Sequence, residues 1–256
     1  MITNRLYQRA NEVRDGGLPV IWRFVFTLIG MGLATLPLLL VRALRPVVTI
    51  RFGMLLSGRI GHFGPNTEIY LCERDAGLHG GRVIDIFYCG RQVCNKQLKT
   101  MWSRSVLMSS FARRMDQCNR RIPGYKHHMI PWRDHQDHDI HGLLAQTEPH
   151  LSFTAEEEAQ GQAALEELGI PKGAPFVCFH ARDSSYLDAL RGDGVWQYHD
   201  YRDSNIHNYV PAVEELTCRG YFGVRMGASV KESLTTTNPM IIDYATNGRR
   251  TDFLDI

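Results

Sequence analysis

The sequence predicts an α/β protein with parallel sheets, built from two units and preceded by an apolar helix. Strand-like apolar runs alternate with helical segments along residues 47–256, which is typical of parallel sheets. Two glycines and two prolines fall within residues 169–175 and separate two such alternating stretches. The predicted domains are therefore 1–46, an arm with the apolar helix; 47–170, a first α/β domain; and 171–256, a second α/β domain.

The apolar segment covers residues 24–41, FVFTLIGMGLATLPLLLV, and Arg23 and Arg42 flank it. A helix of this length extends about 27 Å, close to the ~30 Å hydrocarbon core of a bilayer. A transmembrane or monotopic anchor, an interfacial helix and a buried core helix all stay open, and we favour a membrane-associated helix. In residues 1–60, arginines far outnumber the two acids, Glu12 and Asp15, which favours an anionic surface.

The net charge and the cysteine spacing limit the class of partner and the cellular environment that the sequence predicts. The formal net charge of +2 does not indicate a nucleic-acid partner. The six cysteines show no disulfide-framework spacing, which favours a reducing, cytosolic environment.

In the first domain, residues 47–55 have the β-branched content of a strand, and a glycine-rich loop follows. Residues 82–90 predict a second strand, and residues 95–115 one amphipathic helix. The polar, proline-bearing stretch 116–142 predicts a loop.

In the second domain, Thr154 and Glu157 form a capping-box pattern, so we expect a helix that Gly169 ends. A buried strand is predicted at 176–179, followed by a helix at 208–220 and strands at 221–227 and 240–245. Three strands are fewer than the roughly five or six of an average sheet, so we expect the second domain to be cut short.

Polar side chains follow the strands of the second domain. His180, Arg182 and Asp183 come after the first strand, Arg225 lies at the end of the second and Asp243 at the end of the third. Ligands of open α/β sheets bind beyond the carboxyl ends of strands, and two arginines can hold a diphosphate through bidentate bonds. The alternative is an internal salt-bridge network, for example between Arg182 and Asp243.

The segment YRDSN offers a second phosphate-binding group. Asp203 or Ser204 is expected to begin a helical turn, whose backbone amides attract phosphate, and Arg202 supplies a counter-charge. An ordinary N-cap with a surface arginine explains the same residues.

His62 lies in the loop GRIGHFG, where glycines allow a ligand to approach the backbone. Its ordinary pKa near neutrality suits a general base. A structural turn histidine is the alternative.

The segment DHQDHDIHG places His135, His138 and His141 three residues apart. On one helix face these imidazoles would suit zinc or iron, as in a metal-dependent hydrolase that uses the histidines of 127–141. A solvated, histidine-rich loop fits the lack of apolar positions better.

Five segments occur here in an order that closely resembles a family of bacterial glycosyltransferases found with surface-polysaccharide and secondary-metabolite gene sets. They are IRFGMLLSGRIGHF, FHARDSSYL, YRDSNIHNYVPAVEELTCRGY, VRMG and IIDYAT…RTDFLDI, and the resemblance runs from about residue 47 to the end. More distantly, the His-x-Arg after a strand resembles the motif of the fucosyltransferase superfamily.

The resemblance implies a GT-B fold of two Rossmann-like domains, acceptor-side first and donor-side second. His180 and Arg182 match the His-x-Arg and imply binding of the donor diphosphate, while Arg202, Asp203 and Ser204 match the family's own signature. His62 stands where such enzymes often place the acceptor-activating residue.

The expected function is transfer of a sugar from a nucleotide-diphosphate donor to a hydroxyl of a glycan or lipid-linked acceptor. The expected place is the cytoplasmic face of the inner membrane, where nucleotide sugars are made. Arg182, with Arg225 or Arg202, would neutralise the leaving diphosphate, so we expect no metal cofactor. His62 or Asp183 would deprotonate the acceptor. Because the chain stops at FLDI, part of the donor site is expected to be missing, and a non-catalytic fragment is an alternative.

Overall fold

The computed structural model describes residues 32–131, 138–186, 188 and 197–256, together with Trp22, Val25, Ile29 and Gly30. The chain divides into two compact units. Unit 1 comprises Met1–Cys94 and Lys99–Leu151, and unit 2 comprises Asn95–Leu98 and Ser152–Ile256. Helix α6 thus belongs with unit 2. The chain has the mixed α/β class that the sequence predicts, with two small parallel sheets.

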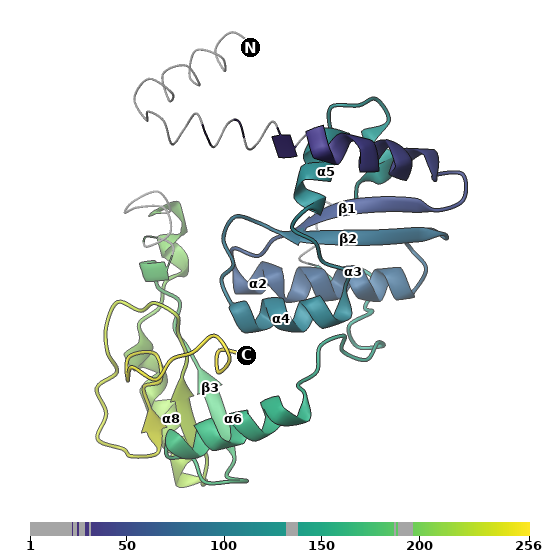
Figure 1. Cartoon of the computed structure of the whole chain (residues 1–256). Coiled ribbons are helices and arrows are strands. Elements are labelled where there is room, and N and C mark those ends of the chain that lie inside the picture. Colours follow the sequence, from purple (N-terminus) through teal and green to yellow (C-terminus); the bar gives the residue numbers. More distant parts are fainter. Residues whose placement is uncertain are drawn as a thin grey trace. The chain divides into compact units, whose positions relative to one another are not determined.

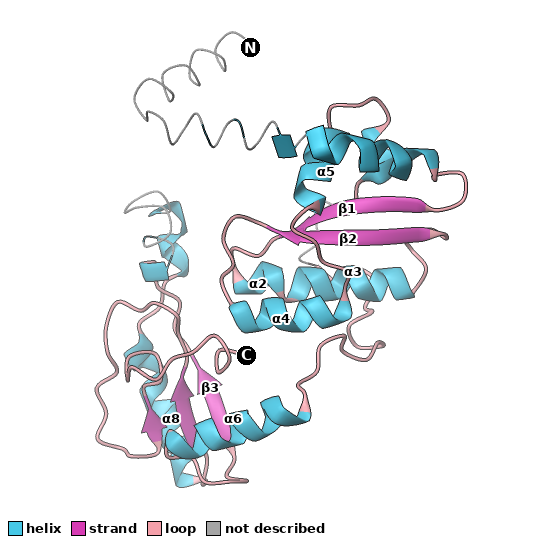
Figure 2. Cartoon of the chain, in the orientation of Figure 1, coloured by secondary structure: helices cyan, strands magenta, loops and turns pink. Residues whose placement is uncertain are grey.

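The sheet of unit 1 is formed by two parallel strands, β1 (Thr49–Leu55) and β2 (Val83–Cys89), which pair along their whole lengths. Both match the predicted strands. Single parallel bridges widen the sheet on each side, with Met129 beside β1 and Met108 beside β2. Figure 2 shows the two long strands side by side.

Helices cover both faces of this sheet (Figure 1). One face carries α2 (Ile60–Phe63), α3 (Pro65–Asp75) and α4 (Lys96–Ser105), and the other carries α5 (Ala112–Asn119) and the helical residues 32–43. A short 3-10 helix, η1 (Tyr125–His128), leads to the bridge at Met129. Helices on both faces explain why the strands are rich in apolar residues.

The prediction of one helix over 95–115 is wrong, because the chain leaves the helix after Ser105 and begins α5 at Ala112. The backbone N–H of Phe87 donates to the carbonyl oxygen of Leu107 at 2.8 Å, and that of Ser109 donates to the carbonyl oxygen of Phe87 at 2.9 Å. Open backbone groups at the β2 edge thus find partners in this segment, and that pairing requires extended backbone.

The prediction of a loop over 116–142 is also wrong in part. Helix α5 continues to Asn119, and η1 lies within the stretch. Residues 132–137 lie outside the described residues.

The apolar segment contributes one face to the core of unit 1. Within helical residues 32–43, Ala34, Leu38 and Val41 are buried and cluster with Phe52 and Tyr88. Positions 24, 26–28 and 31 of the predicted segment lie outside the described residues. Among the residues that the structure does describe, no helix is long and apolar enough to cross a membrane. The packing of this face agrees with a core helix, whereas leucines on the opposite face are exposed.

A buried ion pair joins the two strands of unit 1 at positions that face each other in the register. Arg51 Nε lies 2.7 Å from Asp85 Oδ1 and its Nη2 lies 2.9 Å from Oδ2, and the hydroxyl of Tyr70 donates to the same carboxylate at 2.5 Å. Burial is the main cause that raises the pKa of Tyr70 well above its ordinary value, and the hydrogen bond to Asp85 is the second. These residues sit toward the amino ends of the strands, opposite the edge where ligands bind, so we assign them to stability.

The sheet of unit 2 has three parallel strands in the order β3 (Phe176–Phe179), β4 (Phe222–Arg225) and β5 (Ile241–Ile242). The predicted capping box is confirmed at the start of α6 (Ala155–Glu167), where Thr154 and Glu157 bond each other's backbone N–H. Between β3 and β4 lie η2 (Gln197–Arg202), η3 (Ile206–Tyr209) and α8 (Val210–Cys218).

The prediction that strand 176–179 is buried is wrong, because β3 lies at the edge of the sheet and Phe176 and Cys178 are exposed. The middle strand β4 is instead the buried one. A Cβ at Gly223 would lie 2.2 Å from Val213 Cγ1, so the glycine allows α8 to pack closely on this strand.

Candidate functional site

A cavity of about 300 Å³ lies in unit 2 beyond the carboxyl ends of β3 and β4. Three segments line it: the residues after β3, the segment 203–206 and the loop after β4. Its lining consists of Ala181, Asp183, Asp203, Ser204, Asn205, Ile206, Arg225, Lys231 and Glu232.

Backbone bonds hold these segments together. The N–H of Met226 donates to the carbonyl oxygen of Phe179 at 2.8 Å, so the β3–β4 pairing continues one residue beyond the strand. The N–H of Ser204 donates to the carbonyl oxygen of Arg182 at 2.9 Å. The segments HARD (residues 180–183) and YRDSN (residues 201–205) lie about twenty residues apart in the sequence. They therefore meet at one edge of the sheet.

Asp203 lies between two cations. Arg182 Nε is 3.9 Å from its Oδ1, and Lys231 Nζ is 3.6 Å from its Oδ2. Both separations exceed hydrogen-bond length and the groups are partly exposed, so the pairs are weak. An anion that enters the cavity can compete with this carboxylate for both cations.

Arg225 is buried and lines the cavity. Its Nη1 lies 3.3 Å from Asp243 Oδ2, and the same oxygen accepts the backbone N–H of Leu234 at 2.7 Å and the hydroxyl of Thr246 at 2.5 Å. Asp243 therefore pairs with Arg225, and the pairing of Arg182 with Asp243 considered from the sequence does not form. The carboxylate holds the guanidinium at the strand end.

Asp183 anchors the loop after β4. Its Oδ1 accepts the backbone N–H of Ser185 and its Oδ2 accepts that of Lys231, both at 3.0 Å. These bonds occupy both oxygens of the carboxylate, which argues against a base role for Asp183.

The segment 202–205 differs from the expectation in its cap. Asn205, rather than Asp203 or Ser204, caps η3 by accepting the N–H of His207 at 2.8 Å. Because η3 is a 3-10 turn of four residues, it does not provide the helical phosphate site that was expected. Ser204 still lines the cavity.

The structure does not bring His180 and Arg202 into the lining of the cavity, and both side chains are exposed.

Lys231 is the lining cation that sequence reasoning missed. It lies four residues beyond the RMG motif, in the loop that follows β4. A Cβ at Gly227 would lie 2.6 Å from Val230 Cγ1, so the glycine allows a tight return of the loop toward the cavity. The available signal was a glycine two residues after a strand, with a lysine four residues beyond it.

His62 lies in unit 1 at the end of α2, beyond the carboxyl end of β1, and is half-buried. Its Nδ1 is 3.4 Å from the side-chain nitrogen of Asn66. Ser57 connects the loop between β1 and α2 to the segment after β2. Its hydroxyl donates to the carbonyl oxygen of Gln92 at 2.6 Å and accepts the N–H of Gly90 at 2.9 Å.

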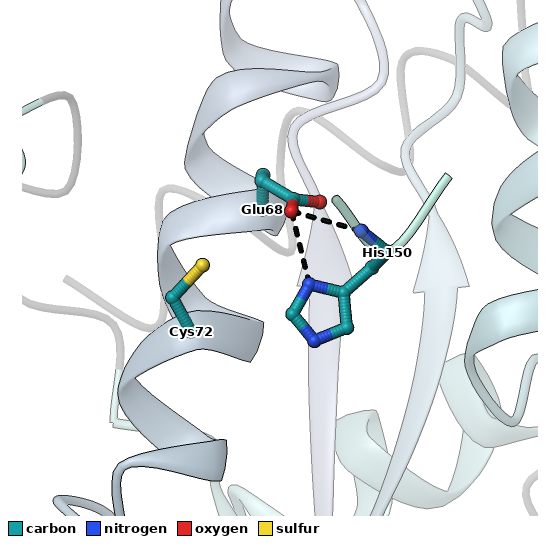
Figure 3. Close-up of side chains that lie close together, drawn as sticks. All are labelled: Glu68, Cys72 and His150. Carbon is teal, nitrogen blue, oxygen red and sulfur yellow. Dashed lines mark hydrogen bonds and ion pairs between the residues drawn. The ribbon is translucent and has the colours of Figure 1, made fainter. Parts of the chain in front are cut away.

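The histidines of 127–141 do not form a metal site within the described residues, and His135 lies outside them. His128 is buried with Nδ1 2.7 Å from the carbonyl oxygen of Ile50, and burial lowers its pKa. Across the described ranges, the residues that could share an ion are Glu68, Cys72 and His150, drawn in Figure 3.

Compared with known proteins, the chain matches no family model, no curated protein and no solved structure.

Proposed function

We propose that this chain is a nucleotide-sugar-dependent glycosyltransferase of the GT-B type, with unit 2 binding the diphosphate of the donor. The observation that carries the proposal is the cavity at the carboxyl edge of the second sheet, which Arg225 and Lys231 line and Arg182 adjoins. The location supports the proposal because ligands of α/β sheets bind at this edge. The resemblance of the motifs supports the choice of a sugar nucleotide among phosphate-bearing ligands.

In this proposal the diphosphate displaces Asp203 as the partner of Arg182 and Lys231. The cavity also contains the carboxylates of Asp183 and Glu232, but Asp183 is already satisfied by two backbone N–H groups. Arg225, held by Asp243, supplies a third cation to the phosphate. Arginine binds phosphate through a planar pair of donors, which favours a fixed orientation of the leaving group.

In the reaction, the hydroxyl oxygen of a glycan or lipid-linked acceptor attacks the anomeric carbon of the donor sugar. The bond from that carbon to the diphosphate oxygen breaks, and the diphosphate leaves with the electron pair. The cations of unit 2 stabilise the charge that develops on it, the part that a divalent metal has in other glycosyltransferases. His62 in unit 1 takes the acceptor proton as general base.

The outer face of helical residues 32–43 supports association with the cytoplasmic face of the inner membrane. Leu33, Leu36 and Leu40 expose 67%, 77% and 63% of their surface, while the opposite face packs in the core of unit 1. A helix with this division lies in the plane of the membrane rather than across it, and the arginine-rich first sixty residues favour anionic lipid.

Co-sedimentation with phosphatidylglycerol vesicles tests the membrane association. We expect Leu36→Ser with Leu40→Ser to lose binding, while the exposed-leucine control Leu107→Ser keeps it. Equal binding of the double variant would contradict this part of the proposal.

Binding of the donor group is tested by thermal unfolding and calorimetric titration of the full chain with UDP, GDP, CDP and pyrophosphate. We expect at least one nucleoside diphosphate to bind, and Arg182→Ala to weaken that binding about 10- to 100-fold, as for loss of a charged hydrogen bond of about 1.5–3 kcal/mol. Arg219→Ala is the matched control, since Arg219 is an exposed arginine paired with Glu215 at the amino edge of the same sheet. A folded protein that binds none of the four would contradict the proposal.

A further inference from the structure

We propose that Glu68, Cys72 and His150 form a zinc site in unit 1, separate from the donor cavity and independent of the proposed function. The thiol sulfur of Cys72, a carboxylate oxygen of Glu68 and a ring nitrogen of His150 all lie within 4.8 Å of one another. Figure 3 shows Glu68 and Cys72 on one helix, with the imidazole of His150 opposite them.

The three ligands come from two separate parts of the chain. Glu68 and Cys72 are four residues apart on α3, so they project from the same face of the helix. His150 comes from a segment more than seventy residues later, and its backbone N–H also donates to Glu68 Oε1 at 3.0 Å. That bond fixes the backbone of His150 beside the helix, so the arrangement does not depend on the side chain alone.

The spacing suits a tetrahedral ion. Zinc bonds to nitrogen and oxygen at about 2.0–2.2 Å and to sulfur at about 2.3 Å, which places donor atoms roughly 3.3–3.7 Å apart. His150 Nδ1 and Glu68 Oε1 are 3.0 Å apart. Cys72 is buried and the other two residues are partly buried. Small side-chain adjustments therefore bring three ligands onto one ion and leave a fourth position for water.

Asp75 supplies the outer support that such sites need. His150 Nε2 lies 3.0 Å from Asp75 Oδ2, while Nδ1 faces Glu68. Metal-bound imidazoles usually donate their second N–H to a carboxylate, which fixes the tautomer and the ring orientation. Asp75 follows Cys72 by three residues on α3, so one helix face provides two ligands and this support.

The ligand types select the metal. A thiolate with an imidazole and a carboxylate suits zinc, whereas magnesium and calcium prefer oxygen ligands alone.

Without a metal, a protonated His150 between Glu68 and Asp75 is the competing explanation of the same contacts. This ion pair does not involve Cys72, whereas a zinc site uses its thiol as a ligand. Replacing Cys72 therefore distinguishes the two explanations. With zinc bound, the segment that ends at His150 is fastened to α3.

The experiment is titration of the chelator-treated full chain with Zn²⁺ against a chromophoric chelator, repeated with Co²⁺ as a spectroscopic probe. We expect one high-affinity ion per chain, a sulfur-to-cobalt charge-transfer band and a rise in melting temperature with zinc. Cys72→Ser should remove the band and weaken zinc binding at least tenfold. Cys118→Ser, which changes another buried cysteine of unit 1, should keep both.

Two further outcomes keep the test decisive. If Cys72→Ser fails to fold, Glu68→Gln and His150→Gln should each weaken zinc binding in a folded chain. Unchanged zinc affinity in the folded variants would assign any bound ion to the histidine-rich segment and overturn the proposal. Absence of the sulfur-to-cobalt band in the unaltered protein would overturn it as well.

Discussion

Replacing Asp203 by asparagine is expected to strengthen the binding of pyrophosphate to unit 2, although a polar contact is removed. The carboxylate lies 3.9 Å from Arg182 Nε and 3.6 Å from Lys231 Nζ, so both cations are partly neutralised in the free protein. Asparagine keeps the shape of the side chain and removes its charge. Both cations then become available to an incoming diphosphate.

The magnitude follows from the exposure of these groups. Partly exposed ion pairs are worth about 0.2–1 kcal/mol each, so releasing two of them makes about 0.4–2 kcal/mol available to the ligand. This corresponds to roughly 2- to 30-fold tighter binding, since about 1.4 kcal/mol is tenfold. The gain should shrink at high salt, because exposed charges are screened.

Isothermal titration of the full chain with pyrophosphate, at low and high salt, measures this effect. Asp200→Asn is the matched control, since Asp200 is exposed and lies within η2, three residues before Asp203. Unchanged or weaker binding by Asp203→Asn would show that Asp203 does not compete with an anion for these cations.

Three further changes test the fold by denaturant unfolding. Thr154→Ala removes the capping box of α6 and should cost about 0.5–2 kcal/mol; a smaller loss would show that the cap contributes little. Gly223→Ala places a Cβ 2.2 Å from Val213 Cγ1 and should cost about 1–3 kcal/mol, with partial rescue by Val213→Ala; absence of rescue would mean that the clash is not the cause. Burial lowers the pKa of His128, so the folded state binds its proton less tightly than the unfolded state, and stability present above about pH 6.5 is lost as the pH falls. His128→Gln should reduce that acid-side loss; a parallel pH profile in His128→Gln would contradict the assignment.

Local signals in the sequence predicted much of the fold. The β-branched runs gave the positions of β1 and β2, and the Thr154–Glu157 pattern predicted the start of α6 because capping depends on residues three apart. The break after Ser105 was not predictable in this way, since it depends on pairing between Met108 and Phe87 of β2. Periodicity also cannot tell an edge strand from a central one.

The candidate site, like the fold, could be predicted from the sequence only in part. Parallel topology was enough to predict that Arg182 and Arg225 lie at one edge of a sheet. Which carboxylate each arginine contacts depends on the course of the intervening loops. Neither the Arg225–Asp243 pair nor the approach of Lys231 to Asp203 has a local sequence signature.

Diphosphate binding by unit 2 is tested most directly by a crystal structure of the full chain with the nucleoside diphosphate that binds best. We expect its phosphates in the cavity of unit 2, within hydrogen-bond distance of Arg182, Arg225 and Lys231, with Asp203 displaced from its two cations. A nucleotide bound elsewhere, with the contacts of Asp203 unchanged, would rule out this donor site.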